Sequence, residues 1–241
     1  MPDALFAHAR LAPIYDAFDG ARDDLDHYLA IIGELGAKRV LDVGCGTGCL
    51  AVLLAGRGIE VVGVDPAEAS LEIAKAKDPE GKITWIHGDA KAAGEAAADL
   101  AVMTGNVAQV FLTDDEWRRT LEGVHTALKP GGHLVFEIRR PGRRVWEDWA
   151  ADTAHDVIDV PGVGEVEQWR EVTEVNLPFV SFRYSYRFAD GEVITSDSKL
   201  WFREREDLEA LLAEHGFRVL DVRDAPDRPG REYVFIARRT T

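Results

Sequence analysis

Cysteine is scarce in this sequence, which holds two cysteines among 241 residues. Two thiols cannot form the disulfide framework of a small secreted protein, so we expect Cys45 and Cys49 to be reduced. They stand about one helical turn apart, which could suit a metal pair, but no further cysteine or histidine cluster completes a site. We therefore predict no metal ion.

Long apolar runs are also missing. No stretch reaches membrane-spanning length, and the chain does not open on a basic region followed by an apolar one. These two absences predict a cytoplasmic protein with no membrane partner. A hydrophobic content of 46% is ordinary for a globular chain, and the length suffices for one large α/β domain.

Basic residues are outnumbered by acidic ones. The sequence has 28 Lys and Arg against 43 Asp and Glu, a formal net charge of -15. Such an acidic surface repels phosphate backbones, so we predict no nucleic-acid partner, although a local basic patch is compatible with this charge.

One stretch stands out, Val40-Leu41-Asp42-Val43-Gly44-Cys45-Gly46-Thr47-Gly48. An apolar run, three glycines at alternate positions and a following helical pattern predict a strand, a tight turn and a helix, which together can seat a nucleotide-like ligand. A Walker loop is excluded because no Gly-Lys-Ser/Thr follows. A dinucleotide, which prefers glycine where Cys49 stands, and a turn without a ligand remain alternatives.

An acidic residue before alternating glycines resembles the first motif of the class I S-adenosylmethionine-dependent methyltransferases. The resemblance implies a Rossmann-like, doubly wound α/β fold with a seven-stranded sheet whose last strand is antiparallel. It implies S-adenosylmethionine as the cofactor, with S-adenosylhomocysteine as the product. Gly44, Cys45 and Gly46 would then pass under the methionine part, and Asp42 would accept its ammonium, directly or through water.

Later motifs fit the same resemblance. Asp65-Pro66 ends the apolar strand predicted for 59–64, where the aspartate would accept both ribose hydroxyls and Pro66 would lie beside the adenine. Gly88-Asp89-Ala90 follows a strand predicted for 82–87, and Asp89 and the Ala90 amide would contact the adenine. The simpler alternatives are a helix-capping role for Asp65 and a turn role for Asp89.

Three further residues are implied at the methionine end. Thr104 and Asn106 follow the strand predicted for 99–103, and Tyr15 lies in an N-terminal helical segment that covers the cofactor in many small-molecule members of the family. The alternatives are local capping by Asn106 and simple packing by Tyr15. No Asn/Asp-Pro-Pro-Tyr/Phe signature follows Met103, which counts against an amino group on a nucleobase or glutamine as the acceptor.

Residues 139–202 interrupt the α/β alternation. Period-two patterns over 166–175, 179–188 and 193–202, with Asp190-Gly191 as a hairpin turn, predict an antiparallel β insertion after the fifth strand. We expect this insertion to form the acceptor side of the site. An arginine there could bind an acidic group of the acceptor. The candidate substrate residues are Gln109, Arg139, Trp146, Tyr184 and Tyr186. Alternatively, the aromatic face packs the insertion on the main domain or on a second subunit, which would give a homodimer.

These observations predict a single methyltransferase domain over residues 1–241. Its parts are the N-terminal helices 1–36, the cofactor-binding core 37–138, the β insertion 139–202, and the C-terminal helix and hairpin 203–241. The predicted activity is methyl transfer from S-adenosylmethionine to a nitrogen or oxygen atom of a small-molecule acceptor. The alternatives are methylation of RNA or protein, and a non-catalytic nucleoside-binding module. No residue can be assigned as a catalytic base.

Overall fold

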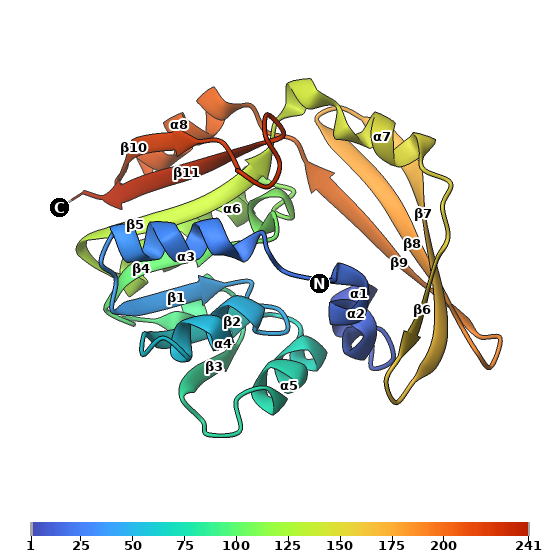
Figure 1. Cartoon of the computed structure of the whole chain (residues 1–241). Helices are drawn as coiled ribbons and strands as arrows, with labels where there is room; N and C mark the ends of the chain where they lie inside the picture. Colours follow the sequence, from blue (N-terminus) through green and yellow to red (C-terminus); the bar gives the residue numbers. More distant parts are fainter. Residues whose placement is uncertain (1, 241) are drawn as a thin grey trace.

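The computed structural model describes residues 2–240, which form two β-sheets with helices around them (Figure 1). The larger sheet has seven strands in the order β10-β11-β5-β4-β1-β2-β3. Its strands are β1 (Arg39–Val43), β2 (Glu60–Asp65), β3 (Ile83–His87), β4 (Ala98–Met103), β5 (Leu128–Arg139), β10 (Phe217–Arg223) and β11 (Glu232–Arg239).

The direction of these strands confirms the predicted fold class. β1 runs parallel to β2 and β4, and β4 runs parallel to β5. β11 lies between β5 and β10 and is antiparallel to both. The central strands are buried on both faces, which explains why β1 reads as a continuous apolar run rather than an alternating one.

Helices cover both faces of the larger sheet. Val40 and its neighbours pack against α3 and α4 on one face, and Leu41 belongs to the core under α6 and α8 on the other. The helices are α1 (Ala4–Ala7), α2 (Tyr15–Asp19), α3 (Leu25–Glu34), α4 (Cys49–Ala55), α5 (Glu68–Ala76), α6 (Asp114–Ala127), α7 (Val145–Ala151) and α8 (Arg205–Glu214). Short 3₁₀ turns are η1 (Ala12–Ile14), η2 (Ala90–Ala93), η3 (Val107–Gln109) and η4 (Pro141–Arg143).

The insertion forms a separate antiparallel sheet in the order β6-β7-β8-β9. Its strands are β6 (Asp156–Val160), β7 (Gly164–Asn176), β8 (Phe179–Phe188) and β9 (Val193–Trp201). The three longer strands match the sequence prediction, whereas β6 was not predicted. β6 is mostly exposed and, among the described strands, pairs only with β7. Its sequence therefore shows little of the apolar–polar alternation that indicates a half-buried strand.

The N-terminal segment joins the two sheets. α1 and α2 lie between them (Figure 1), and the amide of Leu5 donates to Ser196 Oγ on β9 at 2.8 Å. Ser70 on α5 donates to the Phe6 carbonyl at 2.9 Å, which ties the same segment to the larger sheet. Within residues 2–240, no helix is both long enough and apolar enough to cross a membrane.

Candidate functional site

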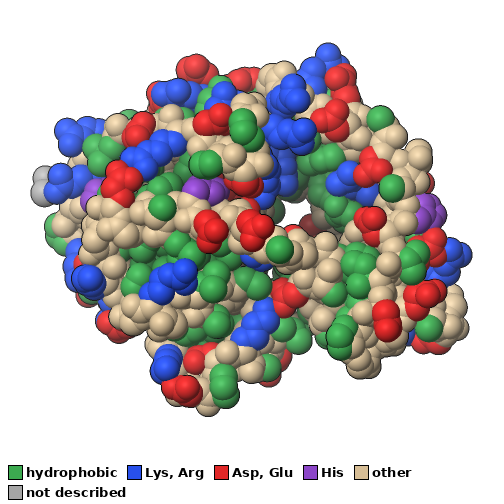
Figure 2. Space-filling view, in the orientation of Figure 1, with side chains coloured by type: hydrophobic (Ala, Val, Ile, Leu, Met, Phe, Trp, Pro, Cys, Tyr) green, Lys and Arg blue, Asp and Glu red, His purple; other side chains and the backbone are tan. Residues whose placement is uncertain are grey.

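A cavity of about 790 Å³ lies where β1, β2 and β4 end, and it extends to the insertion. Figure 2 shows the molecule hollowed between its two halves. Ligands of open α/β sheets bind outside the carboxyl ends of the strands, so this is the expected place for a small-molecule site. Residues from the N-terminal segment, the glycine loop and the insertion all line it.

The three glycines after β1 have conformations that other residues adopt at a cost. Their φ angles are +71° at Gly44, +52° at Gly46 and +79° at Gly48. A Cβ on Gly44 would lie 2.7 Å from Val107 Cγ2, and one on Gly48 would lie 2.6 Å from the ring of Trp85. A Cβ on Gly46 would meet no atom within 4 Å. Two glycines therefore permit close packing, and the middle one borders open space.

Asp42 is a buried carboxylate in the wall of this cavity. It lies at the end of β1 with 1% exposure, and burial, together with the charge of Asp65, raises its pKa to about 7. Within the part of the chain that the structure describes, its Oδ2 atom has no hydrogen-bond partner. A buried acceptor without a donor is costly, so this atom marks a place where a ligand donor would be favourable.

Asp65 closes the glycine loop from the neighbouring strand. Its Oδ2 accepts from the Gly46 amide at 2.8 Å and its Oδ1 accepts from the Ala67 amide at 2.7 Å. Burial raises the pKa of Asp65, and these two backbone bonds oppose that rise. Asp65 therefore holds the amide of Ala67 just before α5, whereas α5 itself has no side-chain cap, and the ribose role stays a prediction.

The other predicted cofactor residues divide into two groups. Residues that line the cavity beside the loop are Tyr15, Cys45, Pro66, Asp89, Ala90 and Thr104. Asn106 lies outside the lining and is 2% exposed. Its backbone amide donates to Glu137 at 2.5 Å, and its side-chain Nδ2 donates to Glu232 at 3.0 Å. The structure thus places Asn106 behind the cavity wall rather than in it.

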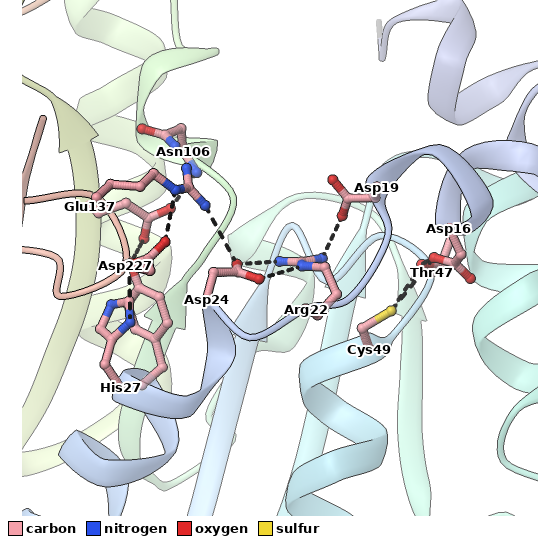
Figure 3. Close-up of polar contacts among 12 residues, drawn as sticks. Asp16, Asp19, Arg22, Asp24, His27, Thr47, Cys49, Asn106, Glu137 and Asp227 are labelled. Carbon is pink, nitrogen blue, oxygen red and sulfur yellow. Dashed lines mark hydrogen bonds and ion pairs between the residues drawn. The ribbon is translucent and has the colours of Figure 1, made fainter. Parts of the chain in front are cut away.

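Sequence reasoning missed Arg22, which lines the cavity from the segment between α2 and α3. Its guanidinium donates to both carboxylate oxygens of Asp24, at 2.8 and 2.9 Å, and forms an ion pair with Asp19 at 2.9 Å (Figure 3). Its charge also acts on Asp42. Among the described residues that line the cavity, Arg22 and Lys199 are the cations. The only sequence signal was an arginine set among aspartates.

None of the five predicted substrate residues lines the cavity. Gln109 accepts from Arg139 and donates to the Trp201 carbonyl, and Trp146 packs edge-on against Phe202. Arg139 lies over Trp149 at 5.3 Å, Tyr184 accepts from Arg170, and Tyr186 accepts from Gln168 and packs on Phe18. These side chains join the insertion to its neighbours, as in the packing alternative, because large aromatic groups gain most from apolar partners. Their role toward an acceptor stays a prediction.

Other residues of the insertion form the far wall of the cavity. They are Thr173 and Glu174 on β7, Ser181 and Phe182 on β8, and Asp197, Ser198 and Lys199 on β9. Asp3, from the N-terminal segment, completes the wall and accepts from Ser198 Oγ at 2.5 Å. Burial raises the pKa of Asp3. This wall is rich in carboxylates and hydroxyl groups, unlike the aromatic wall that the sequence suggested.

Comparisons with known proteins relate this chain to methyltransferases. Residues 40–132 match a family model described as a methyltransferase domain. A putative methyltransferase of Geobacillus sp. (strain WCH70) is 27% identical, over 92% of this chain and 93% of its own length. The ubiquinone biosynthesis O-methyltransferase of Acinetobacter baylyi is 33% identical, but over 43% of this chain and 44% of its own length. A sugar N-methyltransferase structure from Streptoalloteichus has a TM-score of 0.77 at 21% identity, covering 91% of this chain and 88% of that one.

Proposed function

Because the chain belongs to the class I S-adenosylmethionine-dependent methyltransferases, we propose that it methylates an amine nitrogen of a small-molecule acceptor in the cavity between its two sheets. The cofactor is S-adenosylmethionine. We further propose that the glycine loop and the residues around it hold the cofactor, and that the wall formed by the insertion faces the acceptor.

The cavity residues fit the groups of this cofactor. The unpartnered Asp42 Oδ2 suits the ammonium of the methionine part. Arg22 uses three of its five N–H donors on Asp19 and Asp24. The remaining donors, with the nearby Tyr15 hydroxyl, suit the methionine carboxylate. Asp65 oxygens retain lone pairs for the ribose hydroxyls.

The bound cofactor supplies a methyl group already activated by its sulfonium. The protein then has to orient an acceptor, keep water out and receive a proton. The cavity is walled on one side by the glycine loop and on the other by the insertion, so these two walls would hold the cofactor and the acceptor in one enclosed space.

One observation carries the preference for an amine: the acceptor wall has carboxylates and no imidazole. Asp3, Glu174 and Asp197 line it and outnumber its one cation, Lys199, and within residues 2–240 no histidine lines it. Carboxylates attract a protonated amine. A hydroxyl acceptor usually needs a general base near neutral pH, most often histidine. Burial raises the pKa of Asp3, which suits it to receive a proton from an ammonium group.

The relatives include methyltransferases named for oxygen and for nitrogen as the methylated atom. The Acinetobacter relative is an O-methyltransferase, and the Streptoalloteichus structure is a sugar N-methyltransferase. An oxygen acceptor is therefore the second candidate. Methylation of RNA is disfavoured by the net charge of -15 and by carboxylates in the acceptor wall.

A panel of small amines and their hydroxyl analogues tests the proposal, with S-adenosylhomocysteine release as the readout. We expect turnover of amines and a rise in KM for the amine of about tenfold or more in Asp3→Asn, because one ionic contact is lost. Glu214→Gln, an exposed change on α8, is the control and should match the wild type. Turnover confined to hydroxyl compounds, or an unchanged KM in Asp3→Asn, would contradict the amine assignment.

A further inference from the structure

Glu137 is a buried carboxylate on β5 that does not touch the cavity. It is 2% exposed, and both of its oxygens are used. Oε2 accepts from the Tyr28 hydroxyl on α3 at 2.6 Å, and Oε1 accepts from the backbone amide of Asn106 at 2.5 Å. Figure 3 shows Glu137 and Asn106 side by side, on the opposite side of Asp24 from Asp19. A buried carboxylate in contact with a backbone amide fixes the position of that peptide.

The peptide belongs to a turn, residues 104–107, that follows β4. Two successive residues have left-handed backbone angles, φ +76° at Gly105 and +62° at Asn106. Asn106 tolerates this conformation better than most residues but still needs its surroundings to hold it there. Its side-chain Oδ1 has no partner in the described part of the chain. The hydrogen bonds to Glu137 and Glu232 therefore hold Asn106 in its left-handed conformation.

The turn connects this buried carboxylate to the cavity. Thr104 and Gly105 form part of the cavity wall. Val107, the next residue after Asn106, fills the space beside Gly44, where an added Cβ would lie 2.7 Å from Val107 Cγ2. A shift of the turn would therefore move both the cavity wall and the packing of the glycine loop.

We infer that Glu137 is a positioning residue, which holds the 104–107 turn against the glycine loop and so sets the shape of the cofactor end of the cavity. This inference rests on the proposed cofactor seat. It goes beyond that seat, because Glu137 is not among the residues that line the cavity.

The charged groups around Glu137 make the contact sensitive to pH. Tyr28 faces it from α3, Glu232 from β11, Arg228 from the loop before β11, and Arg139 from its own strand. Burial raises the pKa of Glu137 to about 7, against hydrogen bonds from Tyr28 and Asn106 that lower it. Below that pH the carboxyl group becomes neutral, and a neutral acceptor holds an amide about half as strongly as an ionised one.

Two measurements on the full chain test the inference. The first follows the Asn106 amide proton by NMR without any ligand. We expect a downfield resonance that moves as the pH crosses about 7, and no such movement in Glu137→Gln. The second is the dissociation constant of S-adenosylhomocysteine, by calorimetry at pH 8.5. Glu137→Ala should raise it at least about tenfold, the effect of losing one charge-assisted hydrogen bond.

Two variants separate positioning from simple fold stability. Glu137→Gln keeps a carbonyl oxygen for the Asn106 amide and an NH₂ for the Tyr28 oxygen, so binding should return to within about threefold of the wild type. Tyr28→Phe removes the other hydrogen bond of the same carboxylate and leaves the turn contact, so it should also stay within about threefold. Equal losses in Tyr28→Phe and Glu137→Ala, or an Asn106 amide indifferent to both pH and Glu137→Gln, would overturn the inference. A wild type that binds no S-adenosylhomocysteine would refute the proposed cofactor seat. The NMR measurement needs no ligand, so it would still test the hydrogen bond between Glu137 and the Asn106 amide.

Discussion

Replacement of Gly44 by alanine should destabilise the protein through two separate costs. The residue has φ +71°, where an alanine is disfavoured by about 1–2 kcal/mol. The new Cβ would lie 2.7 Å from Val107 Cγ2, and Val107 is β-branched and cannot easily rotate away. Such overpacking adds about 1–3 kcal/mol. The sum of about 2–5 kcal/mol is a large part of a typical net stability of about 5–15 kcal/mol.

The matched control is Gly46→Ala in the same loop. Gly46 also has a positive φ, +52°, but an added Cβ meets no atom within 4 Å. Only the backbone cost applies, about 1–2 kcal/mol. Urea unfolding at pH 7.5 would measure both variants, with the midpoint falling and the slope unchanged. Because Gly46 borders the cavity, Gly46→Ala should also weaken S-adenosylhomocysteine binding.

A double variant isolates the contact. In Val107→Ala the methyl groups that meet the new Cβ are absent, so Gly44→Ala should cost about 1–3 kcal/mol less in that background than in the wild type. Equal stability losses in Gly44→Ala and Gly46→Ala, together with additive effects in the double variant, would refute this account of the glycine loop.

Four further predictions concern the cofactor end. Calorimetry should show S-adenosylmethionine affinity falling as the pH drops below about 7, where Asp42 becomes protonated, and Asp42→Asn should lose most of this dependence. Because burial raises the Asp42 pKa, its contribution to stability is present below its ordinary value of 3.8 and is lost as the pH rises to about 7; urea unfolding should therefore find Asp42→Asn more stable than the wild type at pH 8, with a smaller difference at pH 5.5. Arg22→Gln should weaken S-adenosylhomocysteine binding at least about tenfold, while Arg205→Gln on α8 should not; equal affinities would remove Arg22 from the site. Asp65→Ala should weaken binding sharply, and an unchanged dissociation constant would reject its ribose role.

The seven-stranded sheet was implied by the family resemblance, and the local signals of the sequence agreed with it. The apolar run ending in Asp42 predicted a strand that is buried on both faces, and the glycines predicted the tight turn that follows it. Thr113 and Glu116 have the spacing of a capping box, and the structure contains that box at the start of α6. In each case the cause lies within a few residues of its effect.

The acceptor side could not be predicted because it depends on which parts of the molecule cover the insertion. The period of two correctly grouped Phe182, Tyr184 and Tyr186 on one face of β8, but it cannot say what that face meets. The N-terminal segment, through Leu11 and Ile14, covers the Tyr186 end, whereas Phe182 remains on the cavity. Arg22 lies in a connecting segment without periodicity, so only the fold brings it beside Asp42.

The most direct test of the central claim is calorimetric titration of the wild-type protein with S-adenosylmethionine and with S-adenosylhomocysteine at pH 7.5. The cavity offers Asp42 Oδ2, which has no hydrogen-bond partner within residues 2–240, a cation at Arg22 and an open glycine at Gly46. We therefore predict one site per chain with a dissociation constant well below about 1 mM, or more than about 4 kcal/mol of binding free energy. Failure of both compounds to bind more tightly than about 1 mM would contradict the assignment of this cavity as the cofactor site.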